Sequence, residues 1–235
     1  MNTPEEYDAR IARIMSKIDA IKDREFRITC GEWPPAWEPP VTEEAVAALE
    51  KKYNFRLPED YRRFITTVAA SGSQPFYGLE NLFDKDKDDE FNFSSLGKPF
   101  PYTIDKPLIM IHLTEEELYG DDEEEDDNEE EDEEGGYIPL CTEGCGMYSM
   151  LVVNSDDPDT YGTVWFWDFS DDYGTAPIGD KASGKPFHFL DWLEYWVDRT
   201  AQLSPEEYFT YMETVLEPEP PDNPDIIGRK MGWIK

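Results

Sequence analysis

The chain has 235 residues, 39% of them hydrophobic, and a formal net charge of −33. This length and apolar content favour one domain with extensions, built around one sizeable core. The charge argues against direct binding to nucleic acid or anionic membranes and makes a basic protein the natural partner. Three cysteines, no secretory signal and no apolar run long enough to span a membrane predict a cytoplasmic protein.

Residues 1–40 are predicted to form a helix followed by an extended arm. Isoleucines at helical spacing between residues 4 and 24 give that helix one apolar face. We expect this face to pack on the main domain; a dimerisation helix is the alternative. The arm, residues 31–40, carries four prolines and two tryptophans. It is expected to pack Trp33 and Trp37 on the domain, or alternatively to act as a peptide ligand for another protein.

Two short amphipathic helices are predicted between Val41 and Val68. Thr42 is suited to cap the first helix, Asn54 to end it in a left-handed conformation, and Pro58 to take the first position of the second. The residues expected to reach the core from the second helix and the turn after it are Tyr61, Phe64, Ile65, Val68, Phe76, Tyr77, Leu79 and Leu82.

The second half of the chain is predicted to supply most of the sheet. Strands are expected at residues 107–111, 137–140, 147–153 and 162–169, with a tight turn at 141–146 and a polar loop at 170–184. Helices are then predicted at residues 188–200 and, from the capping box that begins at Ser204, at 204–215.

A run of thirteen acids and one asparagine occupies residues 121–134. These acids are Asp121, Asp122, Glu123, Glu124, Glu125, Asp126, Asp127, Glu129, Glu130, Glu131, Asp132, Glu133 and Glu134. The run is a solvated spacer, an electrostatic clamp for a basic partner, or a low-affinity cation buffer. Removing its thirteen acids from the charge of −33 leaves −20, so the rest of the chain also favours basic partners.

The sequence gives little support for a catalytic or metal-binding site. Cys141 and Cys145 lack the further ligands of a zinc site, and a Cys145–His188 nucleophile pair lacks an orienting third group. The acids at residues 156–159 do not have the spacing of a calcium loop, and an acid–base pair among Asp168 and the acids at 171–172 has no pocket to support it. We therefore expect no catalytic residue, no metal and no cofactor.

Several blocks of the chain, taken in order, resemble the SUKH superfamily, which includes yeast cell-wall-assembly regulators and bacterial immunity proteins. The blocks are NFRLPEDYRRFI at residues 54–65, the turn at 72–82, the strand–turn–strand YIPLCTEGCGMYSMLVV at 137–153, the strand at 162–169 and the helix at 189–196. The resemblance implies an α+β fold with a curved, mostly antiparallel sheet and helices packed on it. The expected domain is residues 41–202 with the acidic insert at 121–134, flanked by the extension 1–40 and a C-terminal helix and tail at 203–235.

The resemblance implies a binding protein, because bacterial members bind and block a cognate toxin domain in the cytoplasm. Together with the charge, it predicts an immunity protein for a basic toxin, of unspecified oligomeric state. A non-enzymatic regulatory scaffold is the alternative, and an unrecognised enzyme is a third hypothesis. The candidate partner-binding residues are the thirteen acids together with Glu143, Trp165, Trp167 and Asp168, although each tryptophan is also suited to the core.

Overall fold

The computed structural model describes residues 3–24, 32–84, 91–110, 135–144, 146–168, 174–202 and 216. The helices in these ranges are α1 (Pro4–Ile21), α2 (Glu43–Tyr53), α3 (Glu59–Thr67) and α5 (Phe189–Gln202), with a 3-10 helix η2 (Phe93–Gly97). The strands are β1 (Leu108–Ile109), β2 (Tyr137–Gly144), β3 (Met147–Val152), β4 (Val164–Asp168), β5 (Gly174–Pro177), β6 (Gly179–Asp180) and β7 (Lys185–Pro186). The acidic insert and the predicted helix at 204–215 lie outside the described residues.

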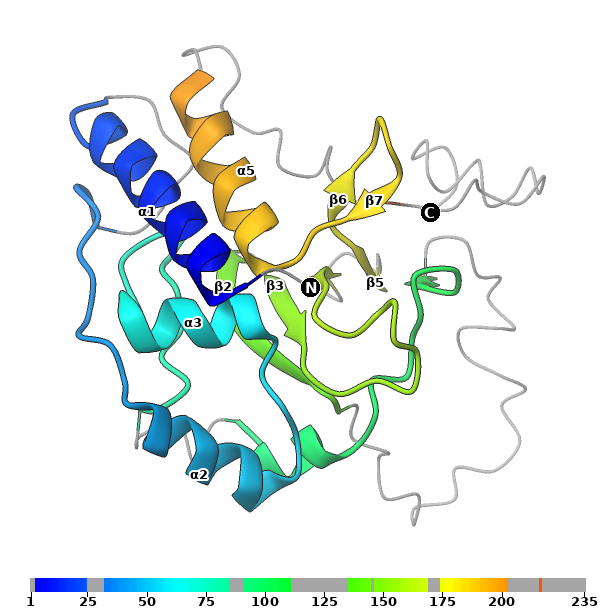
Figure 1. Cartoon of the computed structure of the whole chain (residues 1–235). Coiled ribbons are helices and arrows are strands. Elements are labelled where there is room, and N and C mark those ends of the chain that lie inside the picture. The colour runs from blue at the N-terminus through cyan, green and yellow to red at the C-terminus, as the bar shows by residue number, and fades with distance from the viewer. Residues whose placement is uncertain are drawn as a thin grey trace, which may run out of the picture.

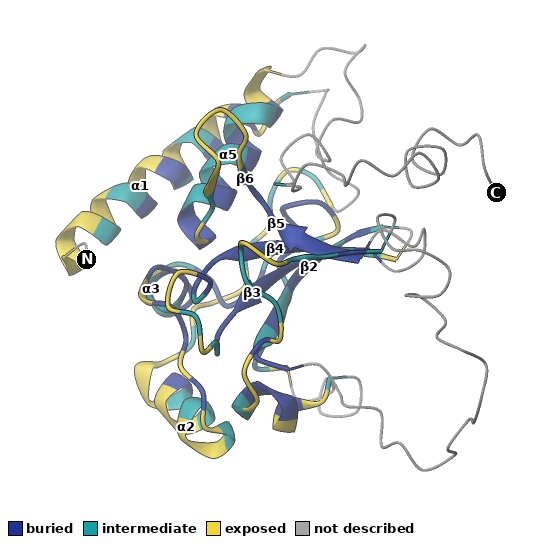
Figure 2. Cartoon of the chain, turned by 90° about the vertical axis from the view of Figure 1, so that its right-hand side faces the viewer, coloured by how far each residue is buried: buried dark blue, intermediate teal, exposed yellow. Residues whose placement is uncertain are grey.

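The described residues form an α+β fold, as the sequence predicted. The main sheet has the order β1-β5-β4-β3-β2, with every neighbouring pair antiparallel, and β6 and β7 form a separate hairpin. Figures 1 and 2 show α1, α3 and α5 together on one side of this sheet. The main core lies between these helices and the sheet, and it takes its sheet side chains from alternate strand positions.

The helix boundaries follow local capping chemistry. The Thr42 hydroxyl accepts a hydrogen bond from the N–H of Ala45, and Asn54 ends α2 with φ 54° and ψ 48°, which confirms both predictions. Pro58 caps α3 from the position before its first helical residue, one position earlier than predicted. The predicted N-terminal helix also forms, with Ile11, Ile14, Ile18 and Ile21 buried.

Helix α1 packs on the domain as predicted, and ion pairs align it along α5. Arg10, Arg13 and Lys17 of α1 all bond the carboxylate of Glu194 on α5, with N–O distances of 2.9–3.1 Å. Burial on its own raises the pKa of Glu194, but the hydrogen bonds from Arg13, Lys17 and Arg10 outweigh it and lower the pKa to about 2. The amphipathic face and these charges together fix α1 in one orientation.

The proline-rich arm lies against the domain, as the packing alternative predicted. The Trp37 ring meets Phe64 edge-on at a centroid distance of 6.0 Å, and Trp33 also packs against the core. Gly72 is necessary beneath Trp37, because a Cβ atom at residue 72 would lie 2.3 Å from the indole ring.

Two segments predicted to be turn or loop are strands in the structure. Residues 141–144 continue β2 instead of forming a tight turn, because bulges at Pro139/Cys141 and Thr142/Gly144 absorb the extra residues within the β2–β3 pair. Gly174–Pro177 forms the buried strand β5 between β4 and β1, within the segment predicted as a polar loop. Its small residues carry no alternating apolar pattern, so only the neighbouring strands reveal it.

Tyr77 is another correction, because it was expected in the core and is 51% exposed. The N–H of Tyr77 donates to the carbonyl of Thr142 at 3.4 Å, which holds this residue beside β2. A Cβ atom at Gly144 would lie 2.9 Å from the Tyr77 ring, so the ring rests outside the strand over Gly144. The neighbouring Phe76, Leu79 and Leu82 are buried, as predicted.

Candidate functional site

The candidate site is a groove on the face of the sheet that points away from α1, α3 and α5. Alternation along β3 and β4 places Met150, Val152 and Trp165 in a second, smaller hydrophobic cluster, separate from the main core. Phe100 covers one end of this face and meets Trp165 edge-on at 4.9 Å between ring centroids. Towards the other end the face carries Tyr148, which is 42% exposed.

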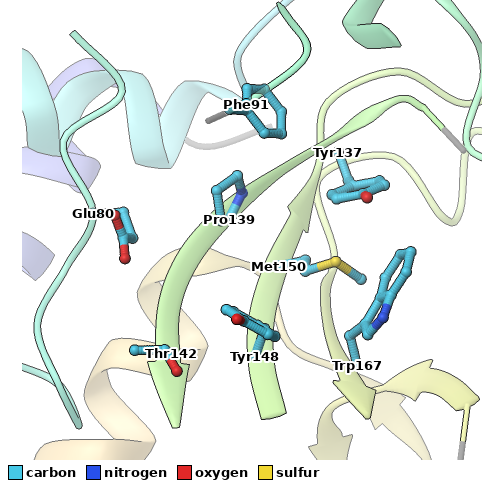
Figure 3. A pocket seen from close by; sticks show the side chains of 8 residues that line it. All are labelled: Glu80, Phe91, Tyr137, Pro139, Thr142, Tyr148, Met150 and Trp167. Atoms are coloured by element: carbon cyan, nitrogen blue, oxygen red, sulfur yellow. The ribbon is translucent and has the colours of Figure 1, made fainter. Parts of the chain in front are cut away.

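The groove has a volume of about 560 Å³. Within the described ranges, its lining residues come from β2, β3, β4 and two loops, and they are Glu80, Phe91, Tyr137, Pro139, Thr142, Tyr148, Met150 and Trp167 (Figure 3). A volume of this size is within the range of small-ligand pockets, and it also suits a short segment of another protein.

Aromatic rings from three adjacent strands form much of the groove. Tyr137 of β2 and Trp167 of β4 lie 5.0 Å apart between ring centroids, at an interplanar angle of 45°. Tyr148 of β3 is paired in register with both Thr142 and Trp167, so it stands in the same row across the sheet. Tyr148 is 42% exposed, whereas Met150 beside it is buried. The groove therefore has an apolar base and an accessible aromatic ring.

The segment that carries Glu80 borders β2 on the other side of the groove. The N–H of Glu80 donates to the carbonyl of Leu140 at 2.7 Å, so the segment is hydrogen-bonded to the edge of the sheet. Thr142 on β2 is held by its own hydroxyl, which donates to the Met147 carbonyl and accepts from the N–H of Gly144. In Figure 3, Glu80 and Trp167 lie on opposite sides of the view, with Met150 and Tyr148 between them.

The structure places the predicted partner-binding residues in very different environments. Trp167 lines the groove, whereas Trp165 is completely buried and Asp168 is 2% exposed. Glu143 is 7% exposed, on the core side of β2. Trp165 is therefore a core residue, the alternative that the sequence also allowed. Among the described candidates, Trp167 is the one that lines the groove. The thirteen acids of the insert lie outside the described residues.

The β2 bulge explains why Glu143 is buried. Leu140 and Cys141 are consecutive and both buried, which shifts the alternation of β2 so that Glu143 also faces inward. Burial raises the pKa of Glu143 to about 7, and the hydroxyl of Ser149, which donates to this carboxylate, only partly offsets the effect. Burial also raises the pKa of the Cys141 thiol, so this cysteine is a poor nucleophile.

The remaining candidates for chemistry are only partly described. Cys145 and the acids at residues 171–172 lie outside the described residues. Within the described ranges, no group of three or more His, Cys, Asp or Glu side chains is placed to hold a metal ion. No helix in the same ranges is both long and apolar enough to cross a membrane.

Sequence reasoning missed the lining residues Tyr137, Tyr148 and Glu80. A signal for Tyr148 was present, because strand alternation puts residues 148, 150 and 152 on one face, and antiparallel pairing aligns them with Trp165 and Trp167. Glu80 had no such signal, because it reaches the groove through a loop that borders β2 only in the folded chain.

A family model described as the SMI1/KNR4 family (SUKH-1) matches residues 40–183, which is more than half of the chain. The chain belongs to this family. The match includes α2, α3, the whole main sheet and the eight described groove residues, and it ends before α5. No curated protein and no solved structure gives a significant match. Membership of the SUKH-1 family supports a protein-interaction role, in toxin immunity or in cell-wall regulation.

Proposed function

We propose that this SUKH-1 protein is a cytoplasmic immunity protein that binds a basic toxin domain and occludes it without catalysing a reaction. The observation that carries the proposal is the open aromatic groove on a strongly acidic chain. Aromatic side chains in partly desolvated hollows supply much of the binding energy at protein interfaces, and complementary charge raises the rate of encounter.

The accessible part of the groove is well suited to be the centre of an interface. Tyr148 presents a ring that is 42% exposed, and Trp167 stands beside it on the next strand. A specific complex buries roughly 1,200–2,000 Å² in total, so the partner would extend beyond the groove onto the surrounding surface. The acidic insert returns to the described chain at Gly135, two residues before the groove residue Tyr137. The insert is thus attached close to this centre.

A binding role without catalysis is supported by the burial of Asp168, the one described acid of the candidate acid–base pair, and of the nearby acid Glu143. Glu143 and Asp168 are 7% and 2% exposed, and neither lines the groove. A general acid or base must reach its substrate within hydrogen-bonding distance. The described lining of the groove presents aromatic rings, the carboxylate of Glu80 and the hydroxyls of Thr142, Tyr137 and Tyr148, which suit recognition.

The test is co-expression with the protein encoded immediately upstream, scored by growth and by capture of a complex. Wild-type protein is expected to restore growth. Tyr148→Ser is expected to lose rescue because it removes the accessible ring, whereas Tyr148→Phe keeps the ring and should still rescue.

A toxic upstream protein that is neither bound nor neutralised would contradict the immunity proposal. Stable capture of a non-toxic protein that depends on Tyr148 would instead favour the regulatory scaffold.

A further inference from the structure

We propose that the end of β5 and the β6–β7 hairpin form a binding site for a leucine on an extended peptide, which the chain's own Leu216 occupies and which an added peptide can fill when that leucine is removed. We call Pro177 of β5 and Gly179 of β6 the leucine site. Neither residue is among the described lining of the groove, so this site and the proposed function can fail independently.

The backbone of β5 offers a hydrogen-bond acceptor at its outer side. The N–H of Ile178 donates to the carbonyl of Val164, in the chain that forms β4. The carbonyl of Pro177 belongs to the same peptide unit as this N–H, so it points away from β4. On that side β1 pairs with the first two residues of β5, and beyond them the N–H of Leu216 donates to the Pro177 carbonyl at 2.8 Å. Leu216 thus continues the position of β1, as a peptide does when it adds to the edge of a sheet.

The side chain of Leu216 occupies space that Gly179 leaves free. A Cβ atom at residue 179 would lie 2.5 Å from Cδ1 of Leu216, and it would also meet the Lys185 carbonyl and the Cα of Pro186 in the hairpin. The φ angle of Gly179 is outside the left-handed region, so close approach, and not backbone conformation, explains this glycine. The site therefore recognises both a backbone N–H and the aliphatic side chain next to it, which is how strand-adding sites obtain affinity and specificity.

Covalent attachment favours the chain's own leucine over any other. Leu216 comes fourteen positions after Gln202, the last residue of α5. A connection of this kind gives a bound group an effective concentration on the order of millimolar. A site of modest affinity is then well occupied by Leu216, and an unattached peptide has to compete with it. The contact between Leu216 and β5 is thus one that another leucine-bearing segment can replace.

The test is binding of a peptide to the full chain in which Leu216→Ser has emptied the site. Two acetylated and amidated peptides are compared: Glu-Thr-Val-Leu-Glu-Pro, the sequence of residues 213–218, and the same peptide with serine in place of leucine. Binding is followed by the NMR signal of the Gly179 amide. We expect the leucine peptide to move this signal of the variant towards its wild-type position, and the serine peptide to leave it unchanged. Wild type should need about tenfold more leucine peptide, because Leu216 competes.

Hydrogen exchange of the Leu216 amide tests occupancy without a peptide. This amide should be protected in wild type and in Leu216→Met, which keeps a long apolar side chain, whereas residue 216 of Leu216→Ser should exchange rapidly. Unchanged signals from α5 and β3 show that the serine variant is folded. Protection should not depend on protein concentration, because the leucine and its site belong to one chain.

Four results would overturn the inference. They are rapid exchange of the Leu216 amide in wild type, no binding of the leucine peptide to Leu216→Ser, equal binding of the two peptides, and equal binding of the leucine peptide to wild type and variant. Protection that falls on dilution would assign the site to a second copy of the chain and would equally contradict occupancy by the same chain. None of these measurements involves a toxin, so the immunity proposal keeps its own test.

Discussion

The carboxylate of Asp60 on α3 accepts a hydrogen bond from the N–H of Leu190 in the first turn of α5, at 3.1 Å. The same carboxylate accepts from the N–H of Tyr61 at 2.9 Å. The backbone N–H of His188, the residue before α5, donates to the side chain of Asp191. The N–H groups at the start of α5 therefore find carboxylate acceptors on both α3 and α5. A residue 130 positions earlier in the chain thus helps to cap α5 and places a negative charge at its positive end.

Removing this cap should destabilise the fold. Asp60→Ala leaves the buried N–H of Leu190 without this acceptor, and we expect a loss of about 1–3 kcal/mol in the free energy of unfolding. Glu59→Ala is the matched control, because Glu59 is an exposed acid in the same first turn of α3. Chemical denaturation of both variants checks the prediction. Equal losses in the free energy of unfolding would show that Asp60 contributes only as an acid in the first turn of α3, and not through its hydrogen bond to Leu190.

The ion pairs that join Glu194 of α5 to α1 are expected to stabilise the packing of α1 on the domain. Glu194→Gln removes the charge that Arg10, Arg13 and Lys17 share, and we expect a loss of about 1–2 kcal/mol at pH 7. The pKa of Glu194 is lowered to about 2, so its contribution is present above pH 4.5 and is lost as the pH falls towards 2.

Hydrogen exchange of the α1 amides at pH 7 and pH 3 measures this effect directly. The variant should exchange faster than wild type at pH 7, and the difference should shrink at pH 3. The same difference at both pH values would mean that the substitution acts through packing and not through charge.

Burial of Glu143 predicts that its contribution to stability depends on pH in the opposite direction to that of Glu194. Its pKa is raised to about 7, so the folded state is favoured while the carboxyl is protonated and loses that advantage as the pH rises from about 4.5 to 7. Glu143→Gln cannot ionise, and its amide oxygen can still accept from the Ser149 hydroxyl. The stability of this variant relative to wild type should therefore increase by about 2–3 kcal/mol between pH 5 and pH 8.

Urea denaturation of wild type, Glu143→Gln and Glu44→Gln across this pH range tests the prediction. Glu44 is exposed on α2, so its variant controls for the loss of one acid from a chain of charge −33. Parallel stability curves for wild type and Glu143→Gln would contradict the assignment.

The acidic insert makes a kinetic prediction that differs from that of the groove. Deleting residues 121–134 removes thirteen of the acids that attract a basic toxin. We expect slower association and a weaker dependence on salt, with little change in dissociation, because exposed charge acts mainly on encounter. Stopped-flow association at several salt concentrations measures this, with Tyr148→Ser as the comparison that should instead speed dissociation. Unchanged affinity and salt dependence after the deletion would make the insert a spacer.

The amino-acid sequence determined the features that depend on neighbouring residues. Thr42, Asn54 and the isoleucine stripe of α1 specify helix ends and one apolar face through local hydrogen bonds and spacing, and they formed as predicted. The ordered blocks of helices and strands also sufficed to recognise the family and the α+β class, because chain order and alternation are visible without coordinates.

Only the tertiary structure decided which residues reach which face. One bulge in β2 turned Glu143 from a candidate surface acid into a buried one, since a shift of one residue reverses the side of a strand. Strand β5 formed from small residues because β4 and β1 lie on either side of it. The groove needed three strands and the loop carrying Glu80 to come together, and the Asp60 cap needed α3 beside α5. Such long-range pairings have no signature in local sequence, because the packed chain alone brings these residues into contact.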